Sequence, residues 1–378
     1  MKYFLKSLLT TLLLGLPLIA IFCVWMFFHQ KDTYLPLIQK NPVPIREQIK
    51  LDKQKPESEE ADTELTADSN HTVTLSFAGD VHFSELILDA YDKSGISALV
   101  DETMLSHMQN ADLFMLNHEF VLSNRGEAMD DKQYTLRNDP EYVKILQDLG
   151  TDVVSIANNH ILDFGQDAFL DTIDTLENAD IQYVGGGRNI KESSAPLIKE
   201  INGQTFAFLA ATRVSPSADW YAGKNHPGIF QTYDATALNK AIEEVESKAD
   251  HTIVFVHWGV ERSEIPEDYQ RTLAKGYIDA GADLVIGAHP HVLQGFEYYQ
   301  DVPIVYSLGN YLFGNRSDAT VLLNATFDEN KELSIQLIPC KRCNGTLNVL
   351  EDPTKVYNHL TDISFDAAIS HSGALISQ

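Results

Sequence analysis

Positive charge is scarce in this sequence. Its 28 lysines and arginines face 54 aspartates and glutamates, which gives a formal net charge of −26 at pH 7. Because nucleic acids and anionic lipids attract basic surfaces, this balance argues against both as ligands of the folded domain. We expect a solvated acidic surface that repels a polyanionic substrate except where metal ions or local Arg and Lys reverse the field.

Cysteine is also scarce. Of the three cysteines, Cys23 lies in an apolar N-terminal run, and Cys340 and Cys343 form the short motif "PCKRC". This pair leaves two alternatives open, a small disulfide in an oxidising compartment or two free thiols. One pair supplies too few ligands for a zinc site of its own.

The sequence has no repeat at a fixed period, and its hydrophobic content is not low. Hydrophobic residues make up 44% of the 378 residues, which excludes a disordered or fibrous chain and is enough for a large core.

A long run without charge occurs once, from Leu8 to Phe28. As a helix it would span roughly 31 Å, enough for one bilayer crossing. A cleaved signal peptide is the alternative, but the run is long and no small-x-small cleavage site follows it. Lys2 and Lys6 precede the span and no basic cluster follows closely, so the positive-inside rule places the N-terminus in the cytoplasm and the remainder outside the cell.

The segment after this run is rich in charge and proline, with six acids and no base between Pro56 and Asn70. Such a segment buries too little apolar surface to fold. We therefore expect four parts: a cytoplasmic stub and transmembrane signal anchor (1–30), a disordered acidic linker (31–70), one folded domain (71–350) and a C-terminal extension (351–378).

Short apolar runs alternate with amphipathic stretches through the expected domain, which is typical of an α/β sheet. The expected strands are "TVTLSFAG", "ADLFML", "DVVSIA", "QTFAFLAAT", "TIVFVHWG" and "ADLVIGA". The expected helices are "PEYVKILQDLG", "DAFLDTIDTLENAD", "TALNKAIEEVESKA" and "DYQRTLAKGYIDAG". Two later stretches, residues 295–310 and 319–339, look like antiparallel hairpins, so the sheet system is expected to be mixed.

Polar residues follow these strands, and open α/β sheets place their ligands at the carboxyl ends of strands. The strand ends carry Asp80, His82, Asn117, Glu119, Asn159, His160, Asp163, His257, Glu261, His289, His291 and Asn310. Each has an ordinary structural alternative, for example a turn for "NN", a helix cap for "GD" and a packed histidine for "HWG".

The convergence of these residues favours a metal site. Carboxylate, amide and imidazole ligands suit Mn, Fe or Zn, and they are numerous enough for two divalent ions. Burying so many of them without a cation would be costly. In "GAHPHVLQG", Pro290 is expected to bias His289 toward an extended backbone, which would hold the imidazoles of His289 and His291 at a set separation.

The order of motifs resembles a known family. "GDVHF", "NHE", "ANNH" with "LDFG", "HWGVE", "ADLVIGAHPHVLQGFEYY" and "PIVYSLGNYLF" resemble the CapA (PgsA) family of poly-γ-glutamate capsule biosynthesis proteins, over about Thr72 to Phe313. That family is similar to the calcineurin-like metallophosphoesterases. The resemblance implies an αββα four-layer sandwich, preceded here by one N-terminal transmembrane helix.

Carried over by motif, the resemblance implies roles for individual residues. The metal ligands would be Asp80, His82, Glu119, Asn159, His257, His289 and His291, with a bridging position open to Asp80, and His160 would be the acid near the leaving group. Three departures put phosphoesterase activity in doubt, because "ANNH" replaces "GNHD", "NHE" replaces "GD", and Ala288 stands where Gly is usual.

Other residues near the motifs are weaker candidates. Arg137 and Arg213 lie in loops beside expected strands and suit bidentate binding of carboxylate or phosphate oxygens, or an ordinary surface salt bridge. Asn117, Glu261 and Asn310 are candidates for orienting a ligand or substrate. His118 fits no role in the pattern and is left unassigned.

The resemblance implies a single-pass cell-membrane protein, its C-terminal domain extracellular, in synthesis or export of capsular poly-γ-glutamate. Its partners would be the membrane, subunits of a membrane synthase or exporter, and an anionic polymer, with no nucleic acid. Two alternatives remain: a non-catalytic scaffold or polymer-binding subunit, and a stand-alone metal-dependent phosphatase.

Overall fold

The structure is a computed structural model and describes residues 72–314, 318–343 and 345–378. The expected transmembrane span and acidic linker lie outside these residues. Among the described helices, none has both the length and the apolar character needed to cross a bilayer.

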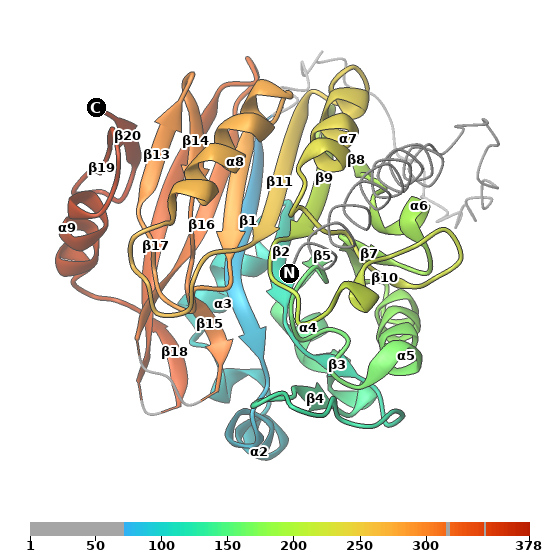
Figure 1. Ribbon diagram of the computed structural model, residues 1–378. Helices are drawn as coiled ribbons and strands as arrows, with labels where there is room; N and C mark the ends of the chain where they lie inside the picture. Colours follow the sequence, from blue (N-terminus) through green and yellow to red (C-terminus); the bar gives the residue numbers. More distant parts are fainter. Residues whose placement is uncertain (1–71, 315–317, 344) are drawn as a thin grey trace, which may run out of the picture. The chain divides into compact units, whose positions relative to one another are not determined.

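Two mixed β-sheets form the centre of the described chain (Figure 1). The first sheet has the order β18-β17-β16-β1-β2-β5-β6, and β15 pairs with β1 as an eighth strand. Its strands are β1 (Val73–His82), β2 (Leu113–His118), β5 (Val153–Ser155), β6 (Gln182–Val184), β15 (Asn310–Phe313), β16 (Ala319–Phe327), β17 (Leu333–Cys343) and β18 (Thr346–Val349). Within it, β1, β2, β5 and β6 are parallel, whereas β16, β17 and β18 are antiparallel.

The second sheet has six strands in the order β13-β14-β12-β11-β9-β8. They are β8 (Leu197–Ile201), β9 (Gln204–Thr212), β11 (His251–His257), β12 (Leu284–Ala288), β13 (Phe296–Tyr299) and β14 (Val302–Val305). Strands β9, β11, β12 and β14 run parallel, with β8 and β13 antiparallel at the two edges. Three short pairs complete the strands: β3 (Val121–Leu122) with β4 (Arg137–Asn138), β7 (Gly186–Gly187) with β10 (Gly228–Ile229), and β19 (Ala367–Ile369) with β20 (Leu375–Ser377).

The two sheets pack face to face. One core cluster contains residues of both, including Phe77 and Leu323 from the first sheet and Phe208, Phe255 and Ile286 from the second. The strands buried on both faces read as nearly continuous apolar runs, as parallel strands covered on both sides should.

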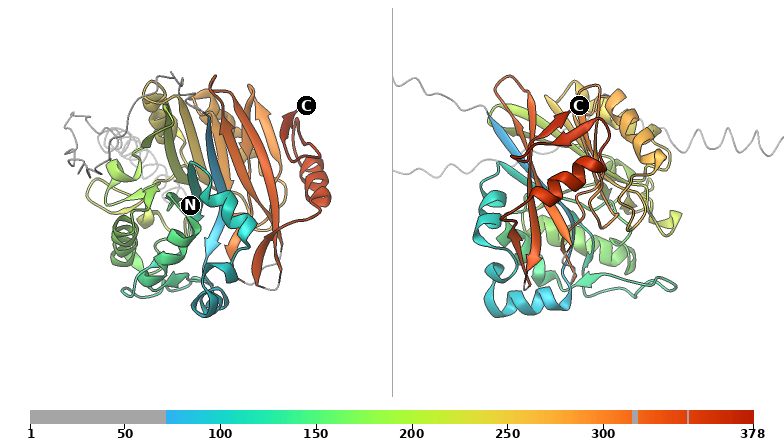
Figure 2. Two further views of the ribbon diagram at one scale, coloured as in Figure 1. Left: turned by 180° about the vertical axis from the view of Figure 1, so that it is seen from behind. Right: turned by 90° about the vertical axis from the view of Figure 1, so that its left-hand side faces the viewer.

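Helices cover the outer faces of the sheets. The described α-helices are α2 (Glu85–Ser94), α3 (Glu102–Gln109), α4 (Val143–Leu149), α5 (Gly165–Asn178), α6 (Ile190–Ser193), α7 (Thr236–Glu246), α8 (Asp268–Asp279) and α9 (Thr354–Asp362). In Figure 1, α7 and α8 lie in front of the second sheet, and the left view of Figure 2 shows α3 on the opposite side. Separate core clusters fill the space beneath each set of helices.

Helix α7 shows how the sequence sets these layers. Leu238, Ile242 and Val245 recur at four- and three-residue intervals, so they share one face, and all three are buried. Helix α8 begins with a capping box, in which the side chains of Glu267 and Gln270 satisfy each other's backbone N–H groups.

The last segment of the chain packs against strands of both sheets, β13 of the second and β17 of the first. Helix α9 contacts β19, which contacts β13, and β20 contacts β17. In the left panel of Figure 2, α9, β19 and β20 lie together at the right-hand edge, and in the right panel they face the viewer. Tyr357 of α9 donates a hydrogen bond of 3.1 Å from its hydroxyl to the carbonyl oxygen of Leu337 in β17.

The mixed α/β prediction is confirmed. Each of the six expected strands overlaps a described strand (β1, β2, β5, β9, β11 and β12), and each of the four expected helices overlaps a described helix (α4, α5, α7 and α8). Both expected hairpins form, as β13–β14 and β16–β17.

Candidate metal centre

The polar residues predicted from strand ends converge where strands of both sheets end. Asp80 lies beside Asn117 in the parallel pairing of β1 and β2. His257 is the last residue of β11, opposite Ala288 at the end of β12. The second sheet thus supplies three histidines to carboxylates held by the first.

A close backbone approach fixes the position of Asp80. The backbone N–H of Asp80 donates a 2.9 Å hydrogen bond to the carbonyl oxygen of Gly309, and Asp80 pairs with Asn310 in register. A Cβ atom on Gly79 would lie 1.9 Å from that same oxygen. Only glycine therefore fits at position 79, and its absence of a side chain lets Asp80 and Asn310 sit side by side.

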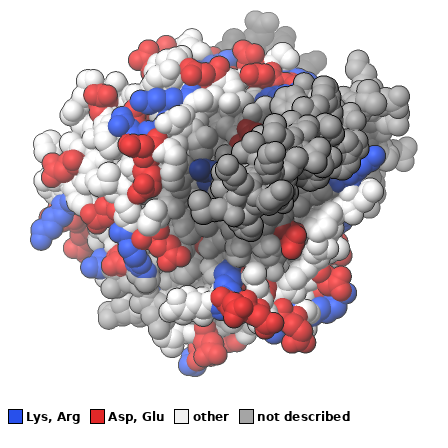
Figure 3. Space-filling view, in the orientation of Figure 1, with Lys and Arg blue, Asp and Glu red and all other residues white. Residues whose placement is uncertain are grey.

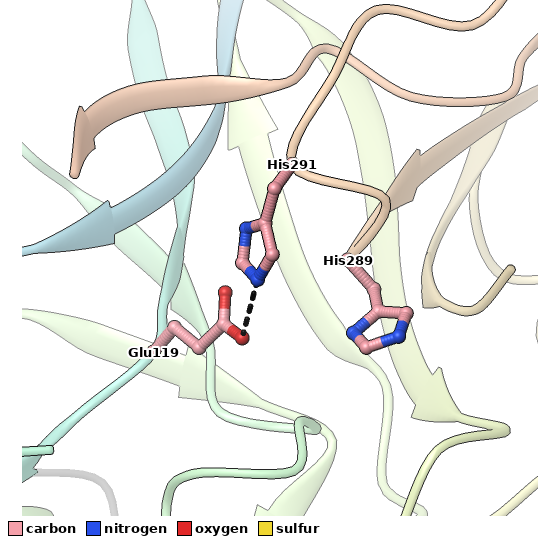
Figure 4. Close-up of side chains that lie close together, drawn as sticks. All are labelled: Glu119, His289 and His291. Atoms are coloured by element: carbon pink, nitrogen blue, oxygen red, sulfur yellow. Dashed lines mark ion pairs between the residues drawn. The ribbon is translucent and has the colours of Figure 1, made fainter. Parts of the chain in front are cut away.

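Two triads of buried side chains have the geometry to hold a metal ion. Glu119, His289 and His291 form one, and Asp80, Glu119 and His257 form the other. Within each triad, one potential ligand atom per residue lies within 4.8 Å of the others. Figure 4 shows the imidazoles of His289 and His291 on the loop after β12, with His291 directed at the Glu119 carboxylate. Glu119 belongs to both triads.

Glu119 is a fully buried carboxylate with an incomplete set of partners. Its Oε2 accepts a 3.2 Å hydrogen bond from Nδ2 of Asn117, whereas Oε1 has no hydrogen-bond partner among the described residues. Oε1 lies 3.7 Å from Nε2 of His257 and 3.8 Å from Nε2 of His291. Burial, followed by the negative charge of Asp80, raises the pKa of Glu119 well above its ordinary value. A cation bound at Oε1 would stabilise the charged carboxylate and so oppose the rise in its pKa.

Asp80 is buried but better satisfied. It accepts hydrogen bonds from Nδ2 of Asn117 at 2.8 Å and from the backbone N–H of His289 at 3.3 Å, and its Oδ2 lies 3.1 Å from Nδ1 of His291. Burial by itself would raise the pKa of Asp80, but these contacts, led by His291, hold the pKa below its ordinary value. Asp80 also raises the pKa of His291, against the effect of burial.

The backbone of the two histidines differs from the prediction. His289 has a φ of 97° and His291 a φ of 58°, so the expectation that Pro290 holds His289 in an extended conformation is wrong. The preference of a residue before proline is overridden here because the turn aims the backbone N–H of His289 at both oxygens of Asp80. Non-glycine residues at positive φ store strain, and such strain clusters at functional sites.

His257 and Asn159 meet across the interface between the sheets. Oδ1 of Asn159 lies 2.8 Å from Nε2 of His257, whose Nδ1 lies 3.3 Å from Nδ2 of Asn117. Burial, followed by the neighbouring histidines, lowers the pKa of His257 well below its ordinary value. His257 is therefore neutral, the form in which imidazole binds metals.

His160 lies beside a buried ion pair that the sequence did not reveal. Its Nδ1 is 2.7 Å from Oδ2 of Asp163 and 3.1 Å from Nζ of Lys132. Lys132 also pairs with Asp163 and donates to the carbonyl oxygen of Asn159. Burial, with a contribution from Lys132, lowers the pKa of His160. Lys132 comes from the loop between β3 and β4, where no motif marks it.

His82, predicted as a ligand, lies at the end of β1 but in neither triad. Its ring makes edge contacts with Phe120 and Phe313, at centroid distances of 5.9 and 5.4 Å. Burial, followed by the charge of His160, lowers its pKa to about 4. His118 packs on Phe120 at 3.9 Å, and burial lowers its pKa to about 3, so it is a neutral core histidine.

The two arginines predicted to bind anions lie outside the triads. Arg137 stacks on Phe164 at 4.0 Å and donates to main-chain carbonyls. Arg213 lies between the rings of Tyr233 and Tyr269. The exposed side chain of Glu261 contributes a negative charge that raises the pKa of Glu119 and of His291.

The cysteines Cys340 and Cys343 are free. They stand three residues apart on β17, so their side chains point to opposite faces of the sheet and no disulfide joins them. Cys340 is buried, which raises the pKa of its thiol.

The residues present fit a divalent metal. The carboxylates of Asp80 and Glu119 and the histidines of both triads are the mixed donors that Mn, Fe and Zn accept. Oε1 of Glu119 and Nδ1 of His289 are buried without a hydrogen-bond partner in the described part of the chain. The described chain is thus a mixed α/β sandwich with a buried histidine and carboxylate cluster able to hold metal.

Comparison with known proteins then gives the family. The model of the bacterial capsule synthesis protein family, PGA_cap, matches residues 74–315, and the chain belongs to that family. The resemblance drawn from the motifs is confirmed.

Curated relatives agree. The chain is 30% identical over 304 residues to "Capsule biosynthesis protein CapA" of Bacillus anthracis, which covers 77% of this chain and 74% of that protein. It is 32% identical over 247 residues to "PGA biosynthesis protein CapA" of Bacillus subtilis (strain 168), over 65% of this chain and 64% of that protein. Among solved structures, a hypothetical protein from Thermus thermophilus is similar with a TM-score of 0.44 and 16% identity, over 72% of this chain and all of that chain.

Proposed function

We propose that this chain is a membrane-anchored extracytoplasmic protein of capsular poly-γ-glutamate synthesis or export, with a di-metal site on an αββα sandwich of the metallophosphoesterase type. Membership of the capsule synthesis family and the names of the two Bacillus relatives support the pathway. The observation that carries the metal site is Glu119, a buried carboxylate shared by two ligand triads, with one oxygen that no described hydrogen bond satisfies.

In this proposal Glu119, which both triads share, would contribute to the binding of both ions. Asp80 and His257 would complete one site, and His289 and His291 the other. His82 and Asn159 are further candidate ligands from their motifs. Two divalent ions, Mn, Fe or Zn, would supply Lewis-acid polarisation of a phosphoryl or carbonyl oxygen.

The chain's own residues have distinct proposed tasks. Asn117 orients both carboxylates through Nδ2, and Asn310 orients His291 through an oxygen 2.8 Å from its Nδ1. His160 would exchange a proton with the leaving group, its ring held by the 2.7 Å contact with Asp163.

The decisive test combines metal content with polymer output. A strain that lacks this gene would be complemented with the wild type, with a His289→Ala and His291→Ala double variant, or with Glu297→Gln, a buried carboxylate outside both triads. We expect the double variant to lose bound metal and surface polymer together, and Glu297→Gln to keep both. Normal metal content in the double variant would contradict the ligand assignment.

His160→Ala separates an enzyme from a non-catalytic scaffold. It lies outside both triads, so the variant should keep its metal. An enzyme should then lose polymer output, whereas a scaffold or polymer-binding subunit would keep it. Turnover of simple phosphate esters with Mn²⁺, without any effect of the gene on polymer, would instead favour a stand-alone phosphatase.

The anchor and its partners are part of the proposal. The charge-free run from Leu8 to Phe28 would hold the folded domain outside the cell, beside synthase or exporter subunits. Protease added to intact cells should digest the folded domain and leave a membrane-bound N-terminal fragment. Protection of the domain in intact cells would contradict this orientation.

A further inference from the structure

Arg213 stands out among the described arginines by what its guanidinium contacts. Four arginines pair with carboxylates, namely Arg125, Arg188, Arg262 and Arg271. Arg213, like Arg137 and Arg342, has no carboxylate within ion-pair distance among the described residues, although the chain has 54 acids for 28 bases. Arg342 donates to two main-chain carbonyls and Arg137 stacks on one phenylalanine, whereas the guanidinium of Arg213 contacts two tyrosine rings.

The side chain of Arg213 is held in place without a salt bridge. The guanidinium carbon lies 4.7 Å from the ring centre of Tyr233 and 4.6 Å from that of Tyr269. One of its five N–H donors reaches the carbonyl oxygen of Tyr233, at 3.3 Å. The two aromatic contacts restrict the guanidinium, and its other N–H donors have no hydrogen-bond partner among the described residues, so they are available for a bidentate oxyanion.

The backbone of Arg213 is hydrogen-bonded to the end of β11, the strand that carries the proposed ligand His257. Arg213 directly follows Thr212, the residue opposite His257 in the parallel pairing of β9 and β11. The backbone N–H of Arg213 donates a 2.8 Å hydrogen bond to the carbonyl oxygen of His257. The hydroxyl of Tyr269 accepts a 2.7 Å hydrogen bond from the backbone N–H of Gly259, two residues after His257. The stacked guanidinium is therefore built onto the segment that carries a proposed ligand.

The net charge of the chain makes a local cation useful for binding an anion. Basic and acidic side chains are interspersed over the described part of the face seen in Figure 3, but the chain has 54 acids for 28 bases, so an approaching anion meets net repulsion. Arg213 offers a local positive charge with a planar array of donors, which carboxylates and phosphates match in geometry.

We infer that Arg213, clamped between Tyr233 and Tyr269, binds an oxyanion group of the substrate next to the metal centre, at a point of the substrate away from the reacting atoms. This rests on the proposed function for the identity of the substrate, a chain of γ-linked glutamates whose free carboxylates recur along its length. The shared chemistry is an oxyanion, and a phosphate group would satisfy the same donors.

Equilibrium binding of a short γ-linked glutamate oligomer tests this inference. We compare the wild type with Arg213→Met, which keeps an apolar stem between the rings, with Arg213→Lys, and with Lys240→Gln on the exposed face of α7 as a control for the loss of one positive charge. Arg213→Met should weaken binding by about tenfold or more, since a charge-assisted bidentate contact is lost. Arg213→Lys should lose less, and Lys240→Gln should match the wild type.

Two measurements on the same samples separate the possible failures. Bound metal should be unchanged in Arg213→Met because the residue lies outside both triads, and the melting temperature should change little because methionine keeps an apolar stem between the rings. Equal oligomer affinity in Arg213→Met and wild type, with metal bound in both, would overturn the role of Arg213 and leave the metal site standing. If the wild type itself binds no metal, the result would instead count against the proposed function.

A second arm identifies the oxyanion. Inorganic phosphate and a γ-linked isoglutamine oligomer, in which α-carboxamides replace the carboxylates, are titrated in parallel. We expect the isoglutamine oligomer not to bind. Phosphate binding that depends on Arg213, without oligomer binding, would assign the arginine to a phosphate group. Binding of neither anion to the wild type would overturn the inference altogether.

Discussion

Two buried glutamates, Glu119 and Glu297, differ in how far the protein itself satisfies their negative charge. Glu297 on β13 is 2% exposed and receives 2.7 and 2.9 Å hydrogen bonds from Arg271, a 2.7 Å contact from Lys275 and a 2.8 Å bond from the Tyr306 hydroxyl. Although burial acts to raise its pKa, these partners lower the pKa of Glu297 to about 2.

Glu119 has the opposite electrostatics. It is fully buried, it faces Asp80 and no lysine or arginine pairs with it among the described residues, so its pKa is raised well above the ordinary value. A carboxylate that the protein satisfies itself stabilises the fold, whereas one that it leaves unsatisfied disfavours its own charge until a cation arrives. The comparison supports the proposal that Glu119 is a metal ligand, and it gives two positions at which the same substitution should have different effects.

Glu119→Gln should have the largest effect, on metal binding. Because Glu119 is shared by both triads, we expect metal affinity to fall by a factor of about 100 or more. Losing a residue that only orients a metal ligand typically lowers affinity by about tenfold to a hundredfold, and loss of a shared ligand should exceed that. The metal-free variant should melt at or above the temperature of the metal-free wild type, since a buried carboxylate with an unsatisfied oxygen is removed. Metal analysis and calorimetry of the two proteins check this.

Lys132→Met should cost about 2–4 kcal/mol of stability, because it leaves the fully buried Asp163 without its cation. Adding Asp163→Asn should recover part of that loss, and a double-mutant cycle in urea measures the coupling. If the stability loss in the double variant equals the sum of the two single losses, Lys132 and Asp163 are not coupled.

Glu297→Gln should cost about 1–3 kcal/mol, less than Lys132→Met, because Arg271 and Lys275 are partly exposed and water can solvate them when the carboxylate is lost. Metal content should not change. A loss of metal in this variant would remove the distinction between the two glutamates.

The smallest effect is a dependence of stability on pH from Glu297. Its folded pKa, about 2, lies below its ordinary value of 4.5, so the unfolded chain binds more protons between these values. Its contribution is present above about pH 4.5 and is lost as the pH falls toward 2. Denaturation curves of wild type and Glu297→Gln should therefore converge on acidification, and a constant difference over this range would contradict the shifted pKa.

Much of this architecture could be predicted because its signals are local. Apolar runs became the central strands, and strand ends placed Asp80, Glu119 and His257 at one site, because parallel strands bring their carboxyl ends together. Both triads form because β1 and β2 are parallel neighbours in one sheet and β11 and β12 in the other, an arrangement of parallel strands that the alternation of strands and helices in the sequence predicted.

What the sequence did not indicate depends on longer-range geometry. The positive φ of His289 is set by the carboxylate of Asp80, more than two hundred residues away. Lys132 reaches the site from a loop whose composition is ordinary. Arg213 was expected as an anion ligand or a surface salt bridge, but its clamp of Tyr233 and Tyr269 brings together rings from two separate segments.

Anomalous scattering from crystals grown with Mn²⁺ tests the central claim most directly. We predict two peaks, each about 2.0–2.3 Å from an oxygen of the Glu119 carboxylate. One should lie beside Asp80 and His257 and the other beside His289 and His291. A saturated crystal without a peak at Glu119, or with metal bound only elsewhere, would contradict the account.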